Sequence, residues 1–263
     1  MLDIQNLVKV FYPGTVNETH AINGITLHIN KGDVVSLIGS NGSGKSTLFN
    51  LISGTFPLTS GKITLDGKDI THQKEYKRAM DIGRVFQDPT KGTAANMSIE
   101  DNMIISSKKG MRWPKFSLYK KGVRERFNDM LKEISLDGRL KDNVGLLSGG
   151  QRQALTLLMT VMSEPKILLL DEHTAALDPP ASDNIMKMTE EIIKERNLTA
   201  MMITHNMKFA IEFGNRLIMM DKGRVILDIT GEEKRTMTVD KLVELFKHKS
   251  NKEFDEDNAL LTN

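Results

Sequence analysis

The sequence contains no cysteine among its 263 residues. Disulfide bonds and metal sites built from thiolates are therefore excluded. It also lacks long apolar runs: one of the longest, Ile167–Leu170, is far below the roughly 18 residues that a membrane-spanning helix needs. The N-terminus has neither the basic start nor the apolar core of a secretion signal. We therefore expect a cytoplasmic protein.

The sequence also lacks a large excess of either sign of charge, because 36 Lys and Arg residues against 34 Asp and Glu residues give a formal net charge of only +2. Such a small charge argues against nucleic acid as the main partner. The sequence has no internal repeats and no low-complexity linker. Its length suits one α/β domain with an added lobe, or two small domains.

A glycine-rich stretch lies between a short apolar run, Val34–Ile38, and a helical pattern that ends at Gly54. It matches G-x-x-x-x-G-K-[ST] without a mismatch and consists of Gly39, Ser40, Asn41, Gly42, Ser43, Gly44, Lys45, Ser46 and Thr47. Glycines let successive N–H groups turn toward one anion, and the helix N-terminus adds partial positive charge. We expect Lys45 to reach the β- and γ-phosphates and the Ser46 hydroxyl to take a Mg²⁺ site.

A second candidate anion site begins at Ser148, which occupies the N-cap position of the helical pattern over residues 154–162. Gly149 and Gly150 follow it and expose backbone N–H groups at the positive end of that helix. One chain does not need two sites for a γ-phosphate. Two chains facing each other would use both.

Polar residues follow three predicted strands. Asp171 and Glu172 end the run Lys166–Leu170, His205 follows Thr199–Ile203, and Gln87 follows Ile82–Phe86. Carboxylates downstream of a phosphate loop suit Mg²⁺ binding and water activation, and ligands bind at this edge of a doubly wound sheet. The alternatives are salt-bridged strand-end acids, a structural histidine and a glutamine that caps a turn.

The segments around these motifs differ in character. Residues 2–30, 61–70 with the turn Asp66-Gly67, and 215–230 have strand patterns, whereas residues 97–147 read as a helical insertion. Phe11 and Tyr12 suit either stacking on a nucleobase or strand packing. Within the insertion, aromatic rings alternate with cations, which suits either a solvated face or a membrane interface. The stretch comprises Lys108, Lys109, Arg112, Trp113, Lys115, Phe116, Tyr119, Lys120, Lys121, Arg124 and Arg126.

Taken in order, these motifs resemble the nucleotide-binding subunits of ABC transporters over roughly residues 2–247. Residues 39–47 match Walker A, Leu147–Gln151 the LSGGQ signature, and Ile167–Glu172 Walker B; Gln87, Asp178 and His205 match the Q-loop, D-loop and switch positions. The resemblance implies an α/β P-loop NTPase core of ABC ATPase type with an antiparallel β subdomain and an inserted helical subdomain. We expect one domain over 1–250, with core and β subdomain at about 1–95 and 148–230, the helical subdomain at about 96–147, and a C-terminal helix and charged tail at 231–263.

The resemblance also implies roles, with ATP and Mg²⁺ as cofactors. Two copies would sandwich two ATP, with residues 39–47 and Lys45 on the phosphates. Ser46 and Gln87 would bind Mg²⁺, and Asp171 would act through water. Glu172 would polarise the attacking water and His205 would hold the γ-phosphate. The opposite chain would complete the site with Ser148, Gly149, Gly150 and Gln151, and the D-loop residue Asp178 would also contribute to nucleotide binding. Phe11 is the preferred base-stacking aromatic, with Tyr12 second.

One departure from the family pattern is His173, which stands where proline is usual after the catalytic glutamate. A second base is conceivable there, but a neighbouring side chain on a turn points elsewhere, so we interpret it as a subfamily mark. The sequences of residues 83–89, 171–178 and 215–220 resemble those of importer subunits for aromatic amino acids such as tryptophan or tyrosine.

The resemblance implies a protein peripheral on the inner face of the membrane, working with a second copy of itself, with permease subunits and indirectly with a solute-binding protein. The permease would dock on the helical lobe near Gln87 and the basic stretch. The alternatives are the ATPase of an exporter or lipoprotein-release system, or a soluble ABC ATPase acting on nucleic acid or ribosomes. The last usually carries two nucleotide domains or a long coiled coil, and no nucleic acid is expected here.

Overall fold

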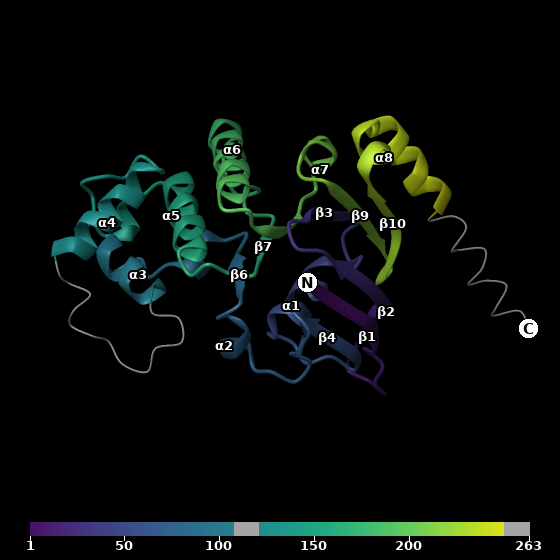
Figure 1. Ribbon diagram of the computed structural model, residues 1–263. Coiled ribbons are helices and arrows are strands. Elements are labelled where there is room, and N and C mark those ends of the chain that lie inside the picture. Colours follow the sequence, from purple (N-terminus) through teal and green to yellow (C-terminus); the bar gives the residue numbers. More distant parts are fainter. Residues whose placement is uncertain (108–120, 250–263) are drawn as a thin grey trace, which may run out of the picture. The chain divides into compact units, whose positions relative to one another are not determined.

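The computed structural model describes residues 1–107 and 121–249 (Figure 1). The chain divides into two units. The first unit combines Met1–His72 with the segment from Met201 onward, and the second unit is Gln73–Ala200. The helical segment expected at 96–147 lies inside the second unit, and the finer subdomain boundaries stay a prediction. Most of the predicted basic stretch, residues 108–120, lies outside the described residues.

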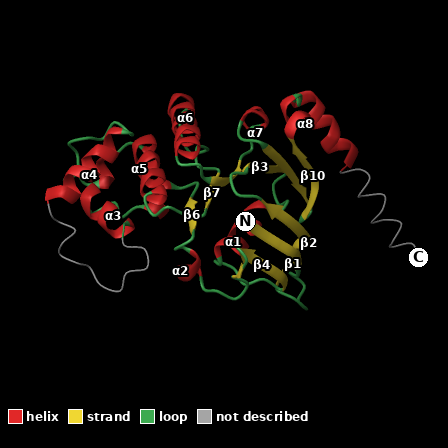
Figure 2. Ribbon diagram, viewed as in Figure 1, coloured by secondary structure: helices red, strands yellow, loops and turns green. Residues whose placement is uncertain are grey.

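An antiparallel sheet forms one part of the first unit. Its order is β2-β1-β4-β5, with β1 Leu2–Phe11, β2 Thr19–Ile29, β4 Ser60–Leu65 and β5 Lys68–Asp69. The predicted turn between β4 and β5 is confirmed, since Asp66 and Gly67 both have positive φ, 49° and 74°. Two such residues in succession give the turn twist that suits a tight hairpin. Figure 2 shows these strands in yellow.

The parallel strand that leads to the phosphate loop also lies in the first unit. Neighbouring strands follow the order β10-β9-β3-β8, with β3 Val34–Gly39, β8 Thr199–Ile203, β9 Arg216–Asp221 and β10 Arg224–Thr230. β3 runs parallel to β9, from Val35 opposite Arg216 to Gly39 opposite Met220. Val35, Leu37 and Ile38 of β3 are buried, as in a strand covered on both faces.

Helices complete the first unit: α1 Lys45–Ser53, α7 Met207–Glu212, α8 Gly231–Arg235 and a helix over residues 239–249. The predicted end of α1 is confirmed, because Gly54 adopts a left-handed conformation at its C-cap. Helix α7 has no counterpart in the expectations from sequence. Asn206 starts it by accepting a hydrogen bond from the Phe209 amide.

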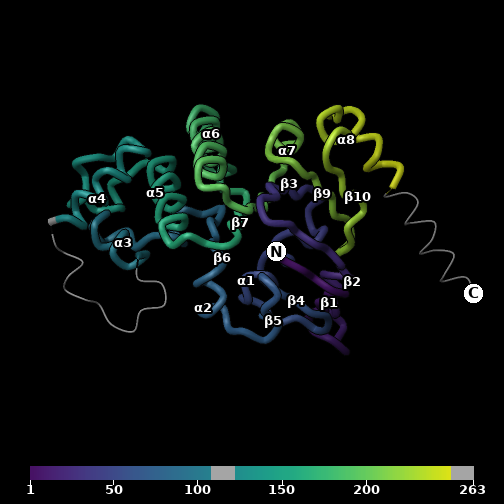
Figure 3. The backbone as a smooth tube through the Cα atoms, in the orientation of Figure 1, coloured from purple at the N-terminus to yellow at the C-terminus, as the bar shows by residue number. Residues whose placement is uncertain are grey.

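The second unit carries two parallel strands and a helical core. The strands are β6 Ile82–Val85 and β7 Ile167–Asp171, and Val85 lies opposite Leu170. Around them are α2 Glu75–Arg78, the 3₁₀ turns η1 Pro89–Gly92 and η3 Val144–Leu146, α3 Ile99–Ser106, α4 Lys121–Lys132, α5 Gly149–Val161 and α6 Pro179–Glu195. Helix α3 lies beside both α4 and α5, which Figure 3 traces in teal.

The helical periodicity expected in the insertion is confirmed by its core. Phe127, Leu131 and Ile134 are buried in one apolar cluster, and Met130 packs against its edge. Within the described ranges, no helix combines the length and apolarity that crossing a membrane requires.

Candidate active site

The phosphate loop joins β3 to α1 and depends on glycine at defined positions. Gly39, Gly42 and Gly44 have φ values of 150°, 81° and 100°, a region that side chains disfavour. A Cβ on Gly39 would lie 2.1 Å from the Met220 carbonyl oxygen, and one on Gly44 2.6 Å from that of Ala21. The loop is therefore closely packed against β2 and β9, and no other residue fits these two positions without moving the backbone.

Lys45 is the first residue of α1 and is 6% exposed. Its ammonium donates to the carbonyl oxygens of Gly39 and Ser40, each at 2.9 Å. The N-cap of α1 is Gly44, and no side chain of the described residues caps it. The first amides of the helix thus face the loop beside a lysine, which is a donor set that fits the phosphates of a nucleotide.

The turn after β9 forms hydrogen bonds with the phosphate loop. Ser40 Oγ donates to Asp221 Oδ1 at 3.1 Å, and the Gly223 amide donates to the Ser43 carbonyl at 3.0 Å. The turn at residues 221–223 was expected from sequence, but its contact with the loop was not. About 180 residues separate the partners, so only the pairing of β3 with β9 reveals it.

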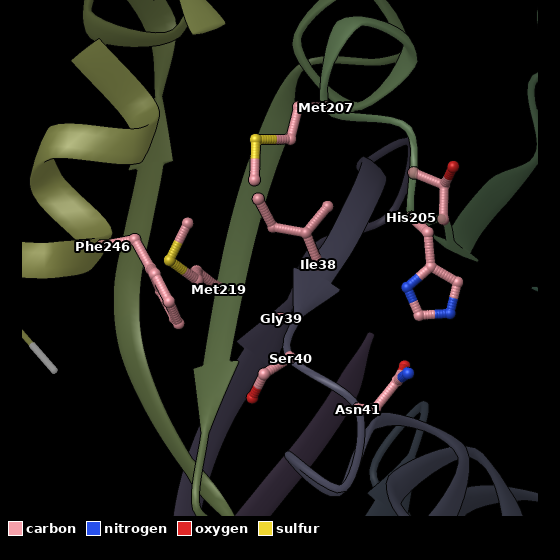
Figure 4. Close-up of a pocket in the computed structure, with 9 residues that line it drawn as sticks. Ile38, Gly39, Ser40, Asn41, His205, Met207, Met219 and Phe246 are labelled. Carbon is pink, nitrogen blue, oxygen red and sulfur yellow. The ribbon is translucent and has the colours of Figure 1, made fainter. Parts of the chain in front are cut away.

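His205 lies at the edge of a pocket of about 280 Å³ beside the phosphate loop. Its ring faces Asn41 in Figure 4. The preceding residue, Thr204, donates its amide to the Leu37 carbonyl at 3.3 Å, which fixes the chain next to β3. The structure therefore brings His205 and the predicted phosphate loop together within the first unit. The pocket is lined by Ile38, Gly39, Ser40, Asn41, Thr204, His205, Met207, Met219 and Phe246.

The two predicted acidic residues lie at the end of β7 in the second unit. Asp171 accepts a hydrogen bond from Arg84 at 2.8 Å, and the two side chains are 14% and 11% exposed. Glu172 has a positive φ of 47° and its carbonyl accepts from the Ala175 amide, so the chain turns sharply there. In this structure Asp171 is therefore a salt-bridged acid at a strand end, which was one of the alternatives expected from the sequence. Sequence reasoning did not identify Arg84.

Gln87 follows β6 and is exposed. The residue before it, Phe86, accepts a hydrogen bond on its carbonyl oxygen from Gln153 Nε2 at 3.1 Å. Gln153 belongs to α5 and is fully buried. The backbone at Gln87 is thereby tied to the helix that starts at the signature motif.

The signature motif starts α5 as predicted. Ser148 accepts from the Gln151 amide, and Gln151 Oε1 accepts from the Ser148 amide, each at 3.2 Å. This reciprocal pair is a capping box. A Cβ on Gly150 would lie 3.3 Å from the Ala181 methyl, so α5 and α6 lie close here. Asp178 caps α6 by accepting from the Ala181 amide at 2.9 Å.

The two candidate base-stacking aromatics differ in environment. Phe11 is half-buried and meets Phe56 edge to face, with centroids 5.4 Å apart, and Lys9 Nζ lies 4.8 Å from its centroid. Tyr12 is 68% exposed. In this structure Phe11 therefore packs against Phe56 beside the strand, as the strand-packing alternative predicts. Contact of either ring with a nucleobase stays a prediction.

The predicted Mg²⁺ ligands are a hydroxyl, an amide and a carboxylate, on Ser46, Gln87 and Asp171. Among the described residues, no group of three or more His, Cys, Asp or Glu side chains could hold a metal ion. The predicted set does not require such a group, and hard oxygen donors are what Mg²⁺ prefers. The residues predicted to bind phosphate through the loop thus lie in the first unit, and the predicted acids and signature lie in the second.

Comparison with known proteins shows which family has a similar sequence and fold. A family model described as "ABC transporter" matches residues 22–175. A tyrosine transport ATP-binding protein of Clostridioides difficile is 46% identical over 254 residues, covering 94% of this chain and 99% of that protein. A methionine import ATP-binding protein of Bacillus anthracis is 31% identical, covering 90% of this chain and 70% of that protein. A dimeric ATP-binding cassette in a post-hydrolysis state bound to ADP and phosphate matches with a TM-score of 0.74 at 27% identity, covering 88% of this chain and 98% of that one.

Proposed function

Because this chain belongs to the ABC transporter family as an ATP-binding subunit, we propose that two copies close around two ATP molecules to drive an importer of aromatic amino acids. ATP binding, and hydrolysis coupled to transport, follow from family membership. The dimer, the magnesium ion, the partners and the cargo are the proposed parts.

The observation that supports the dimer is that one chain holds two glycine-flanked helix starts, each of which suits a phosphate. The first is the uncapped start of α1, with Lys45 folded over the loop. The second is the start of α5, where Gly149 is exposed beside the Ser148 capping box. Each start places backbone N–H groups at the positive end of a helix. A phosphate that bridges the α1 site of one copy and the α5 site of the other uses both.

In the proposed reaction, this chain positions groups and neutralises charge. Lys45 and the loop amides hold the phosphates, and Glu172 polarises the attacking water. His205 holds the γ-phosphate from the edge of its pocket. Phosphoryl transfer needs such positioning and charge stabilisation more than covalent chemistry.

The residues present fit a magnesium ion as oxygen donors, with Ser46 and Gln87 as ligands and Asp171 acting through water. When bound, Mg²⁺ supplies positive charge against the β- and γ-phosphates. The role of this chain is to hold the Asp171 carboxylate in place through its contact with Arg84.

The cargo proposal rests on the relatives. A protein named for tyrosine transport shares 46% of its residues with this chain over nearly the whole of both, and a methionine import subunit matches at lower identity. We therefore infer a peripheral subunit on the inner membrane face that is bound to permease subunits. A solute-binding protein delivers the solute to those permease subunits.

Dimer closure is tested by measuring molar mass at saturating Mg-ATP in the Glu172→Gln variant, alone and with its permease. Dimers that disperse when ATP is removed are expected. A monomer under all of these conditions would overturn the proposed mechanism.

The cargo is tested separately, by calorimetry on the solute-binding protein encoded beside this chain. Binding of tyrosine or tryptophan is expected. Binding of a non-aromatic solute would overturn the cargo and leave the ATPase assignment intact. Co-purification with a lipoprotein-release partner instead would overturn the importer.

A further inference from the structure

Arg84 and Asp171 lie on the same face of the β6–β7 pair. Arg84 is opposite Leu169 in the parallel register, and Asp171 is two residues after Leu169. Alternate residues of a strand share a face, so the two side chains are diagonal neighbours. The Arg84 guanidinium donates to Asp171 Oδ2 at 2.8 Å.

The guanidinium is also held from a second side. Its carbon lies 4.7 Å from the centroid of the Phe86 ring, a contact in which the ring attracts the cation. Phe86 is in turn fixed through its carbonyl by the buried side chain of Gln153. A planar cation between a ring and a carboxylate has few orientations open to it.

The contact with Arg84 determines the orientation of the Asp171 carboxylate. A carboxylate that is 14% exposed loses most of its hydration, and a charged hydrogen-bond donor compensates for that loss. With Oδ2 held by Arg84, the plane of the carboxylate is set, and so is the direction of its other oxygen. Mutation of a group that orients a metal-site residue in this way typically costs about 10- to 100-fold in metal affinity or activity.

We propose that Arg84 is a positioning residue for the divalent-cation site: it holds Asp171 by Oδ2 so that the other carboxylate oxygen meets the hydration shell of Mg²⁺. This inference rests on the proposed role of Asp171 toward Mg²⁺. In this role Arg84 acts through Asp171.

Two substitutions separate positioning from charge. Arg84→Met keeps the apolar stem and removes the cation. Arg84→Lys keeps the charge but loses the planar fork that fixes a carboxylate and stacks on a ring. The matched control is Arg139→Lys, in an arginine–aspartate pair of the same unit, Arg139 with Asp142 at 2.7 Å.

The measurement is binding of a fluorescent ADP analogue to the full chain as Mg²⁺ is titrated, with Mn²⁺ binding followed by paramagnetic resonance. Arg84→Met is expected to raise the Mg²⁺ concentration at half-effect by about 10- to 100-fold, with nucleotide affinity in chelator unchanged. Arg84→Lys is expected to lie between the wild type and Arg84→Met, and Arg139→Lys to match the wild type. Thermal melting in chelator identifies variants that do not fold, and Arg84→Lys then carries the test alone.

Three results would overturn the inference. The first is an Mg²⁺ requirement in Arg84→Met that is unchanged from the wild type. The second is a lowered Mg²⁺ requirement in Arg84→Met, and the third is full wild-type behaviour in Arg84→Lys; either of these two would assign Arg84 to charge balance alone. Asp171→Asn identifies failure of the premise: if the wild type and Asp171→Asn share one Mg²⁺ requirement, the proposed metal role of Asp171 is wrong. If those two differ while Arg84→Met matches the wild type, only the role of Arg84 is wrong.

Discussion

His173 Nε2 lies 3.0 Å from the Thr189 hydroxyl oxygen, and this contact joins the turn after Glu172 to helix α6. Thr189 donates its own proton to the Ile185 carbonyl at 2.7 Å. The imidazole must therefore donate from Nε2, so the neutral ring carries its proton on that nitrogen. His173 is 2% exposed. Its side chain is directed into the fold, which agrees with the interpretation that it is no second base.

Burial lowers the pKa of His173 to about 4 from 6.5, and stability is expected to depend on pH accordingly. Well above pH 6.5 the ring is neutral in both states. As pH falls from 6.5 toward 4, the unfolded chain takes up a proton that the folded chain excludes, so folded stability decreases, by about 3 kcal/mol in all. Denaturant unfolding at pH 7 and pH 4.5 measures this loss, and His173→Gln, which does not titrate, is expected to lose less. Equal losses in the two proteins would contradict a neutral buried imidazole.

Glu172→Gln is expected to abolish ATP hydrolysis while ATP binding persists, because the amide cannot polarise the attacking water but keeps the shape of the side chain. Phosphate release and nucleotide binding are measured on the same preparation. Glu191→Gln, on the exposed surface of α6, is the control and should hydrolyse normally. Full turnover in Glu172→Gln would remove Glu172 as the base.

Gly39→Ala is expected to destabilise the fold by about 2 kcal/mol or more and to abolish nucleotide binding. The new methyl would lie 2.1 Å from the Met220 carbonyl at a φ of 150°, so β3 and β9 must separate. Gly14→Ala also has a positive φ, 75°, but meets no atom within 4 Å. Thermal melting of both variants isolates the effect of the clash. Equal melting temperatures would show that the loop tolerates a side chain.

Mixed dimers test whether the reaction centre contains residues of two chains. Lys45→Met removes the phosphate lysine, and Ser148→Arg blocks the signature, so each variant alone is expected to be inactive. A mixture forms dimers in which one site keeps Lys45 from one chain and Ser148 from the other. Hydrolysis is therefore expected to return on mixing, measured as phosphate release against mixing ratio. A mixture as inactive as its components would refute the shared site.

The sequence alone predicted features that depend on neighbours along the chain. The phosphate loop with Lys45, the Ser148 N-cap and the Asp66-Gly67 turn all form as expected, because glycine conformations and helix capping are local. The order of motifs also identified the family. The role of the basic stretch at 108–126 stays a prediction, and most of the stretch lies outside the described residues.

What only the tertiary structure decided is which distant side chains meet. Ser40 contacts Asp221 because β3 pairs with β9, and Arg84 contacts Asp171 because β6 pairs with β7 in one particular register. A shift of one residue in either pairing would turn these side chains to opposite faces. No local pattern encodes that register. It follows from burying the apolar faces of whole strands, so the partners of the predicted site residues appear only in the folded chain.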